Sequence, residues 1–130
     1  MSTVAEELSR YAPGAPTLLT LGVFDGVHLG HQSLIITLRE RARIRGLRPG
    51  VVTFDPHPLE VLRPDVQLPL LMTVDERVRF IADSGVPLVV PLTFTRDVSE
   101  LAPREFVQLL MACLNMSGLV LGPDSGLGRN

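Results

Sequence analysis

Residues 22–31 read GVFDGVHLGH, and this stretch decides how the rest of the sequence is interpreted. The apolar run before it, 17–21, is typical of a buried strand, and residues 32–38 continue as a helix. Three glycines allow a tight turn and the close approach of a ligand. His28 and His31 lie three residues apart near the helix start, so both imidazoles face the side where unpaired backbone N–H groups point. The pattern therefore predicts a cradle for an anion such as a polyphosphate.

Two other interpretations of this turn stay open. Asp25 and the two histidines could hold a divalent metal ion, although the helical zinc motif places its histidines four residues apart with a glutamate between them. The turn could also be structural, with incidental histidines. The chain has three histidines in all, and two of them lie in this turn beside Asp25, which favours a binding role. We assign no metal ligand from the sequence, and the dinucleotide fingerprint G-x-G-x-x-G is not matched.

The basic residues narrow the chemistry further. The chain has no lysine, so all twelve of its basic residues are arginines. A Walker A phosphate loop requires its lysine, and a Schiff-base enzyme requires a lysine amine, so both classes are excluded. Phosphates bound here would be held by backbone amides, histidine and arginine.

Composition predicts an ordinary globular protein. A length of 130 residues corresponds to one domain, and 45% apolar with 20% charged residues argues against disorder. A net charge of −2 does not favour binding to the phosphates of a nucleic acid. No apolar run is long enough to span a membrane. Residues 1–16 are expected to be an N-terminal leader without signal-peptide features, followed by one domain, 17–130. The single Cys113 cannot form an internal disulfide, and the expected location is cytoplasmic.

The order of the apolar segments predicts an α/β fold. The expected strands are continuous apolar runs without alternation, as a parallel sheet covered on both faces requires. Thr73 and Glu76 fit a capping box, Gly46 fits a helix C-terminus, and Pro103 suits a first helical position. The strands are expected at 17–24, 51–54, 87–92 and 119–121, with helices between them.

Polar residues follow each expected strand. Because the carboxyl ends of parallel strands lie along one edge, where such folds bind ligands, these residues are expected to converge there. Two prolines around His57 predict a stiff, extended, non-helical segment after the second strand. The strand-end residues are Asp25 and His28, then Asp55 and His57, then Thr93 and Thr95, and finally Asp124.

Several of these segments resemble a known family. TLGVFDGVHLGHQ (20–32) resembles the first motif of bacterial FAD synthetases, the FMN adenylyltransferase module of bifunctional riboflavin kinase/FMN adenylyltransferases, and VVTFDPHPLEVLRP (51–64) resembles their second. The resemblance covers residues 17–124, with the motifs in family order. The histidine motif alone is shared across nucleotidyltransferases, whereas Asp55–Pro58 favours the flavin branch. Further matching runs are LLMTVDERVRFIADSGVP, FTRDVSELAPREFVQLL and, for the third motif, VLGPD at 120–124.

The resemblance implies a three-layer, Rossmann-like nucleotidyltransferase fold that transfers AMP from ATP to FMN, giving FAD and pyrophosphate. It implies that His28 and His31 are catalytic and donate to the ATP phosphates. Mg²⁺ would accompany ATP, and Asp25 would orient the turn or the Mg²⁺ shell. The implied binding residues are Gly22, Val23, Phe24, Asp25 and Gly30 at the turn; Asp55, Pro56, His57 and Pro58 on the flavin side; and Gly122 and Asp124 near ATP.

The sequence departs from the family in two places. Ser125 stands where the third motif usually has a phenylalanine, and the Ser-Ser-x-x-Arg segment that covers the triphosphate has no counterpart before Asn130. The riboflavin kinase module has no counterpart either. We therefore expect weak FAD synthesis by this chain, or none, unless a partner chain supplies the segment. One alternative is a nucleotide- or flavin-binding domain without catalysis. Another is an adenylyltransferase for a different phosphate monoester, but the presence of the flavin-side segment, residues 55–58, argues against it.

Overall fold

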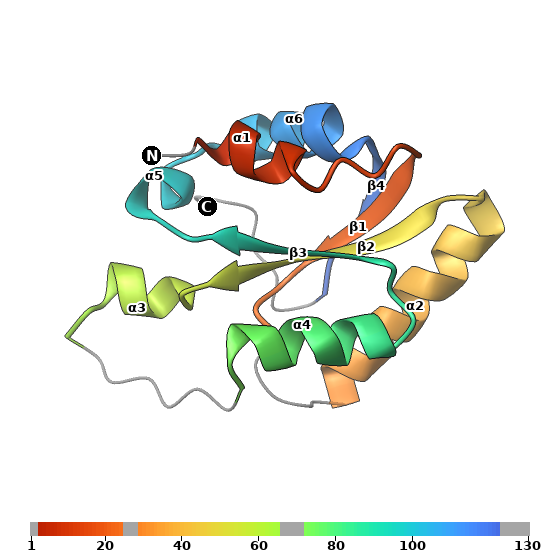
Figure 1. Ribbon diagram of the computed structural model, residues 1–130, viewed down its shortest axis with the longest axis horizontal. Coiled ribbons are helices and arrows are strands. Elements are labelled where there is room, and N and C mark those ends of the chain that lie inside the picture. Colours follow the sequence, from red (N-terminus) through yellow and green to blue (C-terminus); the bar gives the residue numbers. More distant parts are fainter. Residues whose placement is uncertain (1–2, 25–28, 66–71, 123–130) are drawn as a thin grey trace.

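The computed structural model describes residues 3–24, 29–65 and 72–122, and residues 29 and 30 are described by their backbone alone. Its centre is a parallel sheet of four strands in the order β3-β2-β1-β4 (Figure 1). This arrangement confirms the predicted α/β fold. The strands are β1 (Thr17–Leu21), β2 (Arg48–Asp55), β3 (Leu88–Thr93) and β4 (Met116–Val120).

Burial explains why β1 lies in the middle of the sheet. All five residues of this strand are buried, as expected for a strand covered on both faces and paired on both edges. Thr20 is the register partner of Val51 on one side and of Val120 on the other. The Thr17 hydroxyl donates to the Leu114 carbonyl at 3.0 Å, which fixes the strand's first residue.

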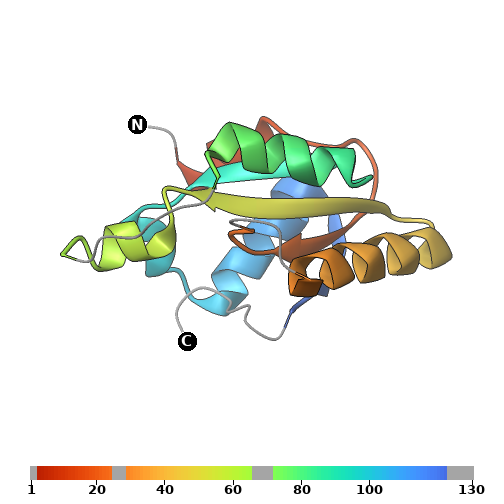
Figure 2. The ribbon, with the colours of Figure 1, turned by 90° about the horizontal axis from the view of Figure 1, so that it is seen from below.

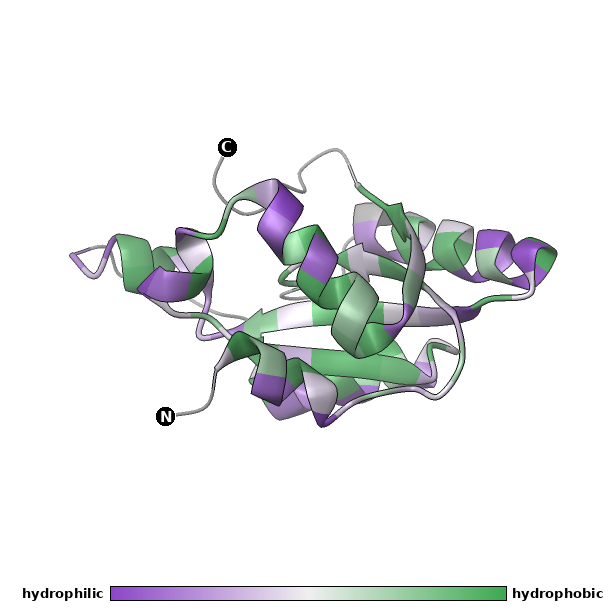
Figure 3. Ribbon diagram, turned by 90° about the horizontal axis from the view of Figure 1, so that it is seen from above, coloured by the Kyte–Doolittle hydropathy of each residue, from purple (hydrophilic) through white to green (hydrophobic). Residues whose placement is uncertain are grey.

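Helices cover the two faces of the sheet, so the fold has the three layers expected (Figures 1 and 2). One apolar cluster joins Leu19, Leu21 and Val52 to α1 and α6, and the other joins Leu18 and Val51 to α2 and α4. The strands are mainly apolar, and the polar residues gather on the helices (Figure 3). The helices are α1 (Val4–Ser9), α2 (Leu29–Arg45), α3 (Pro58–Leu62), α4 (Val74–Asp83), α5 (Arg96–Ser99) and α6 (Pro103–Leu114).

The segment expected to be a polar leader contains α1, and this helix packs against the domain. Leu8 is fully buried in the cluster formed with α6. The Glu7 carboxylate accepts hydrogen bonds from the N–H and hydroxyl of Thr93, at 2.6 and 2.7 Å. Helix α1 is thereby attached to the carboxyl end of β3.

The predicted helix ends are confirmed where local chemistry determines them. Thr73 accepts from the N–H of Glu76 at 3.1 Å, and Glu76 accepts from the N–H of Thr73 at 2.8 Å, which completes the capping box of α4. Pro103 is the first residue of α6, and Gly46 has the left-handed φ of +68° that favours glycine after a helix.

Strands β2 and β4 each begin three residues earlier than expected, at Arg48 and Met116, and two expectations about the segments that follow β1 and β2 are wrong. Strand β1 ends at Leu21 rather than at residue 24, because Phe24 has a left-handed φ of 58° that a strand cannot contain. Pro58 is not extended but begins α3, since proline has a helical φ and lacks only an N–H that would be unpaired in the first turn. In the described residues, no helix is long and apolar enough to cross a membrane.

Candidate functional site

The turn that follows β1 is fastened to β2. The N–H of Gly22 donates to the Val52 carbonyl at 3.1 Å, and the Thr53 hydroxyl donates to the Val23 carbonyl at 2.7 Å. Thr53 is itself fully buried. The backbone of the predicted cradle is therefore held in position by the neighbouring strand.

Phe24, the last residue described before α2, has a left-handed backbone conformation. Its φ of 58° is unusual for an aromatic residue, and such strain is common where a backbone is shaped for function. The ring is 2% exposed and folds back over Gly22, where a Cβ atom would lie only 2.8 Å from Phe24 Cε2. Gly22 is thus required by the close approach of this ring.

His31 lies in the first turn of α2 and packs against the turn. Its ring centroid is 4.8 Å from that of Phe24, with the planes tilted by 52°. Gly30 lies in the same helical turn. The first turn of a helix presents unpaired N–H groups and a positive dipole end, which suit an anion.

The end of β2 carries the second group of predicted residues. Asp55 is exposed, and His57 is the N-cap of α3: its Nδ1 accepts from the N–H of Leu59 at 3.1 Å. The N–H of His57 donates to Glu60 Oε2 at 3.1 Å, so residues 57 and 60 form a capping box. The two prolines around His57 predict an extended segment, whereas Pro58 in fact begins α3.

The residues at the end of β3 hold neighbouring helices, and Gly122 follows β4. Thr93 is held by Glu7, and Thr95 is the N-cap of α5, with its hydroxyl accepting from the N–H of Val98 at 3.2 Å. Gly122 lies two residues after Val120, the register partner of Thr20, so it follows β4 as Gly22 follows β1. The strand order reverses direction between β1 and β4, which is where folds of this type bind ligands.

The described residues thus place Gly22, Val23, Phe24 and His31 together, with Asp55–Pro58 between the end of β2 and the start of α3, and Gly122 after β4 on the other side. Asp25, His28 and Asp124 lie outside the described residues, so the predicted meeting of the two imidazoles stays a prediction. Among the described residues, no cluster of three histidine, cysteine, aspartate or glutamate side chains is placed to hold a metal ion.

The FAD synthetase family sequence model matches residues 12–130 of the chain. The chain belongs to the FAD synthetase family. It is 37% identical over 113 residues to a bifunctional riboflavin kinase/FMN adenylyltransferase of Listeria monocytogenes, a match that covers 86% of this chain and 36% of the relative. The corresponding enzyme of Escherichia coli K12 is 36% identical over 118 residues, covering 90% and 38%. A protein named FAD synthetase from the same Listeria strain is 33% identical over 113 residues, covering 86% and 46%.

A solved structure shares the fold of this FAD synthetase family member. The crystal structure of a macrolide-efflux protein from Streptococcus pneumoniae aligns with a TM-score of 0.81 at 29% identity, covering 94% of this chain and 41% of that one. The chain spans less than half the length of these relatives. The resemblance inferred from the motifs is confirmed at the level of the family.

Arg77 of α4 is not among the site residues predicted from the sequence. The side chain is 2% exposed, and its Nη2 donates to the Phe54 carbonyl at 2.8 Å, one residue before Asp55. A signal was present in the sequence: Arg77 lies four residues before Ile81, on the apolar side of an amphipathic helix. Arginine at such a position predicts either snorkelling to solvent or a buried role.

Proposed function

We propose that this chain provides the nucleotide- and flavin-binding core of an FMN adenylyltransferase, which transfers AMP from ATP to FMN and releases pyrophosphate. The observation that carries the proposal is the turn between β1 and α2, located where the strand order reverses. There a backbone fastened by Val52 and Thr53 meets a helix N-terminus that carries His31. Membership of the FAD synthetase family supplies the reaction class.

In the proposed reaction, an oxygen of the FMN phosphate attacks the α-phosphorus of ATP in line. The new P–O bond of FAD forms as the bond between the α-phosphorus and the bridging oxygen breaks, and that oxygen leaves with pyrophosphate. The chain forms no covalent bond, so its contribution is positioning and charge stabilisation. Mg²⁺ is proposed to enter as part of the ATP substrate.

Residues on the nucleotide side are proposed to act through backbone and imidazole donors. The backbone of Gly22, Val23 and Phe24 lines the nucleotide, and the first turn of α2 faces its phosphates. His28 and His31 donate hydrogen bonds to the phosphates as negative charge develops on the leaving group. Gly122 and Asp124 approach ATP from the end of β4.

The segment Asp55–Pro58 and helix α3 are proposed to form the flavin side. Leu59 and Leu62 of α3 are 43% and 39% exposed, and apolar side chains of this kind suit a flat ring system. Next to this segment, the Phe54 and Phe94 rings pack edge to face at 5.7 Å. Helices α3 and α5 lie beside the carboxyl ends of β2 and β3 (Figure 1).

A second candidate is a binding domain without turnover, since the turn held by Val52 and Thr53 and the first turn of α2 are elements that can hold a ligand without reacting with it. One experiment separates the two functions: incubate the chain with FMN, ATP and Mg²⁺, measure FAD by chromatography, and follow FMN binding by quenching of flavin fluorescence. Formation of FAD supports the enzyme, and binding without FAD supports the binding domain. A chain that binds neither FMN nor ATP would contradict both.

A further inference from the structure

Arg77 is a buried cation, and the part of the chain that the structure describes places no anion beside it. The ion pairs formed among the described residues are Arg43–Glu40 and Arg63–Asp65, both exposed, and neither involves Arg77. The guanidinium donates to the Phe54 carbonyl, while its Nε is buried without a hydrogen-bond partner in the described part of the chain. Burying a charge is costly unless it is paired, so this arrangement requires an explanation.

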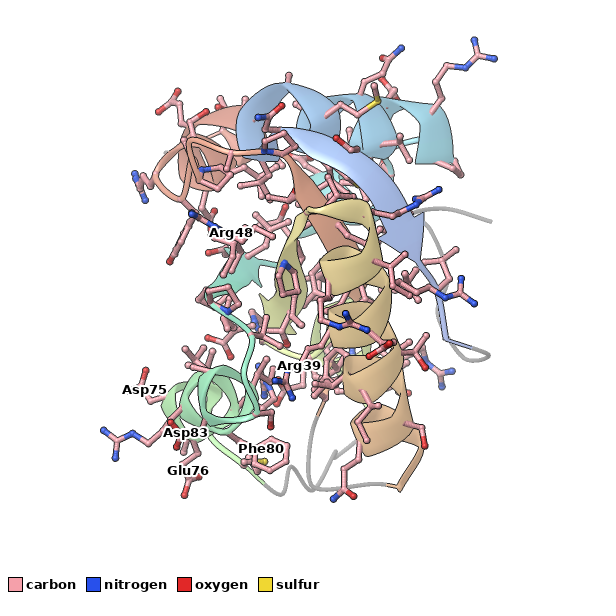
Figure 4. All side chains as sticks on the ribbon, turned by 90° about the vertical axis from the view of Figure 1, so that its right-hand side faces the viewer. Arg39, Arg48, Asp75, Glu76, Phe80 and Asp83 are labelled. Atoms are coloured by element: carbon pink, nitrogen blue, oxygen red, sulfur yellow. The ribbon has the colours of Figure 1, made fainter. Side chains whose placement is uncertain are left out.

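The acidic residues nearest in sequence do not neutralise Arg77. Asp75 and Glu76 are exposed and project from α4 away from the sheet (Figure 4). Glu76 is engaged in the capping box with Thr73. The Phe54 carbonyl is a dipole and carries no net charge, so this hydrogen bond does not neutralise the guanidinium.

The position of Arg77 links the two halves of the proposed site. Its partner Phe54 directly precedes the flavin-side segment Asp55–Pro58. The residue before Phe54 is Thr53, whose hydroxyl holds the Val23 carbonyl of the nucleotide-side turn. The guanidinium is therefore bonded to the strand end that carries the flavin-side segment, next to the residue that holds the nucleotide-side turn.

We propose that Arg77 supplies the counter-charge for the 5′-phosphate of FMN, an inference that rests on the proposed function. Charge interactions are strong in surroundings of low dielectric constant, so the buried guanidinium attracts a phosphate at the sheet edge more than an exposed arginine would. Within the described residues the guanidinium has no anionic partner, and in this proposal its anion arrives with the substrate. A residue kept for binding is often neutral or unfavourable for stability.

The test compares FMN with riboflavin, which has the same ring system but no phosphate. Fluorescence titration gives both dissociation constants for the wild-type chain, Arg77→Gln and Arg77→Lys. Arg77→Gln keeps a hydrogen-bond donor but loses the charge, and it should raise Kd for FMN about 10- to 100-fold while leaving riboflavin binding unchanged. Arg77→Lys should keep most of the preference for FMN.

Two controls separate binding from a structural role. Arg79→Gln removes the same charge from an exposed position of the same helix and should leave both affinities unchanged. The Tm of unliganded Arg77→Gln should equal or exceed that of the wild type, because an unpaired buried charge is removed. A fall in Tm with equal loss of both flavins, or an equal effect of Arg79→Gln, would overturn the assignment. If the wild-type chain binds FMN and Arg77→Gln binds it equally well, this inference alone is overturned. If the wild-type chain binds neither FMN nor ATP, the proposed function is overturned as well.

Discussion

Replacement of Gly22 by alanine tests whether the turn is shaped by the Phe24 ring. The new Cβ would lie 2.8 Å from Phe24 Cε2, 3.2 Å from Cδ2 and 3.3 Å from Cζ. Ordinary carbon contacts are about 3.5–4.0 Å, so the ring must move by roughly 1 Å. It has little room, because it is 2% exposed and its backbone is already in the left-handed region.

Overpacking of this kind costs about 1–3 kcal/mol, so we expect Gly22→Ala to lower Tm by roughly 4–11 °C. Unfolding followed by circular dichroism measures the change.

A double-mutant cycle identifies the cause. Phe24→Leu removes the Cε2 and Cζ atoms, so in that background the penalty of Gly22→Ala should shrink by about 1 kcal/mol or more. If the two substitutions add to within about 0.5 kcal/mol, the ring contact is not what requires glycine at position 22, and the reasoning is refuted.

Three further substitutions test other contacts. Glu7→Ala should lower the free energy of unfolding in urea by about 1–3 kcal/mol, because two hydrogen bonds to Thr93 are lost, whereas the exposed Glu6→Ala should change it by less than about 0.5 kcal/mol. Thr73→Ala should cost about 1 kcal/mol through loss of the α4 cap, and Thr73→Ser should restore most of it; equal losses in both would contradict the capping role. Where turnover is measured, His28→Ala should lower kcat by ~10²–10³ with little change in KM for ATP, and an unchanged kcat would show that His28 has no role in the reaction.

The features that the sequence predicted correctly depend on nearby residues. Continuous apolar runs predicted the four parallel strands, and a pair three residues apart, Thr73 and Glu76, predicted the start of α4. The turn after β1 was recognised from its glycines. The end of β1 at Leu21 was not predicted, because residue type does not indicate the left-handed φ of Phe24, whose ring lies against Gly22 and His31.

The features that were missed depend on distant partners. Glu7 and Thr93 are 86 positions apart, so α1 gave no sign in the sequence that it would dock on β3. Arg77 and Phe54 are separated by 23 residues, and a buried arginine on an apolar helix face cannot be distinguished by pattern from one that reaches solvent. Both require knowledge of which elements become neighbours.

The pairing of β1 with β4 has a consequence for how the chain folds during synthesis. Thr17 and Leu114, which are hydrogen-bonded at the start of this pairing, are 97 residues apart. At ribosomal rates of about 5–20 residues per second, β1 emerges roughly 5–20 s before its partner on that side exists. During this interval the five-residue strand, all of which is buried in the finished fold, presents an unpaired apolar edge of the kind that promotes aggregation. Yield in cells should therefore depend on translation speed and chaperone supply over residues 22–116, even for variants whose final stability is unchanged.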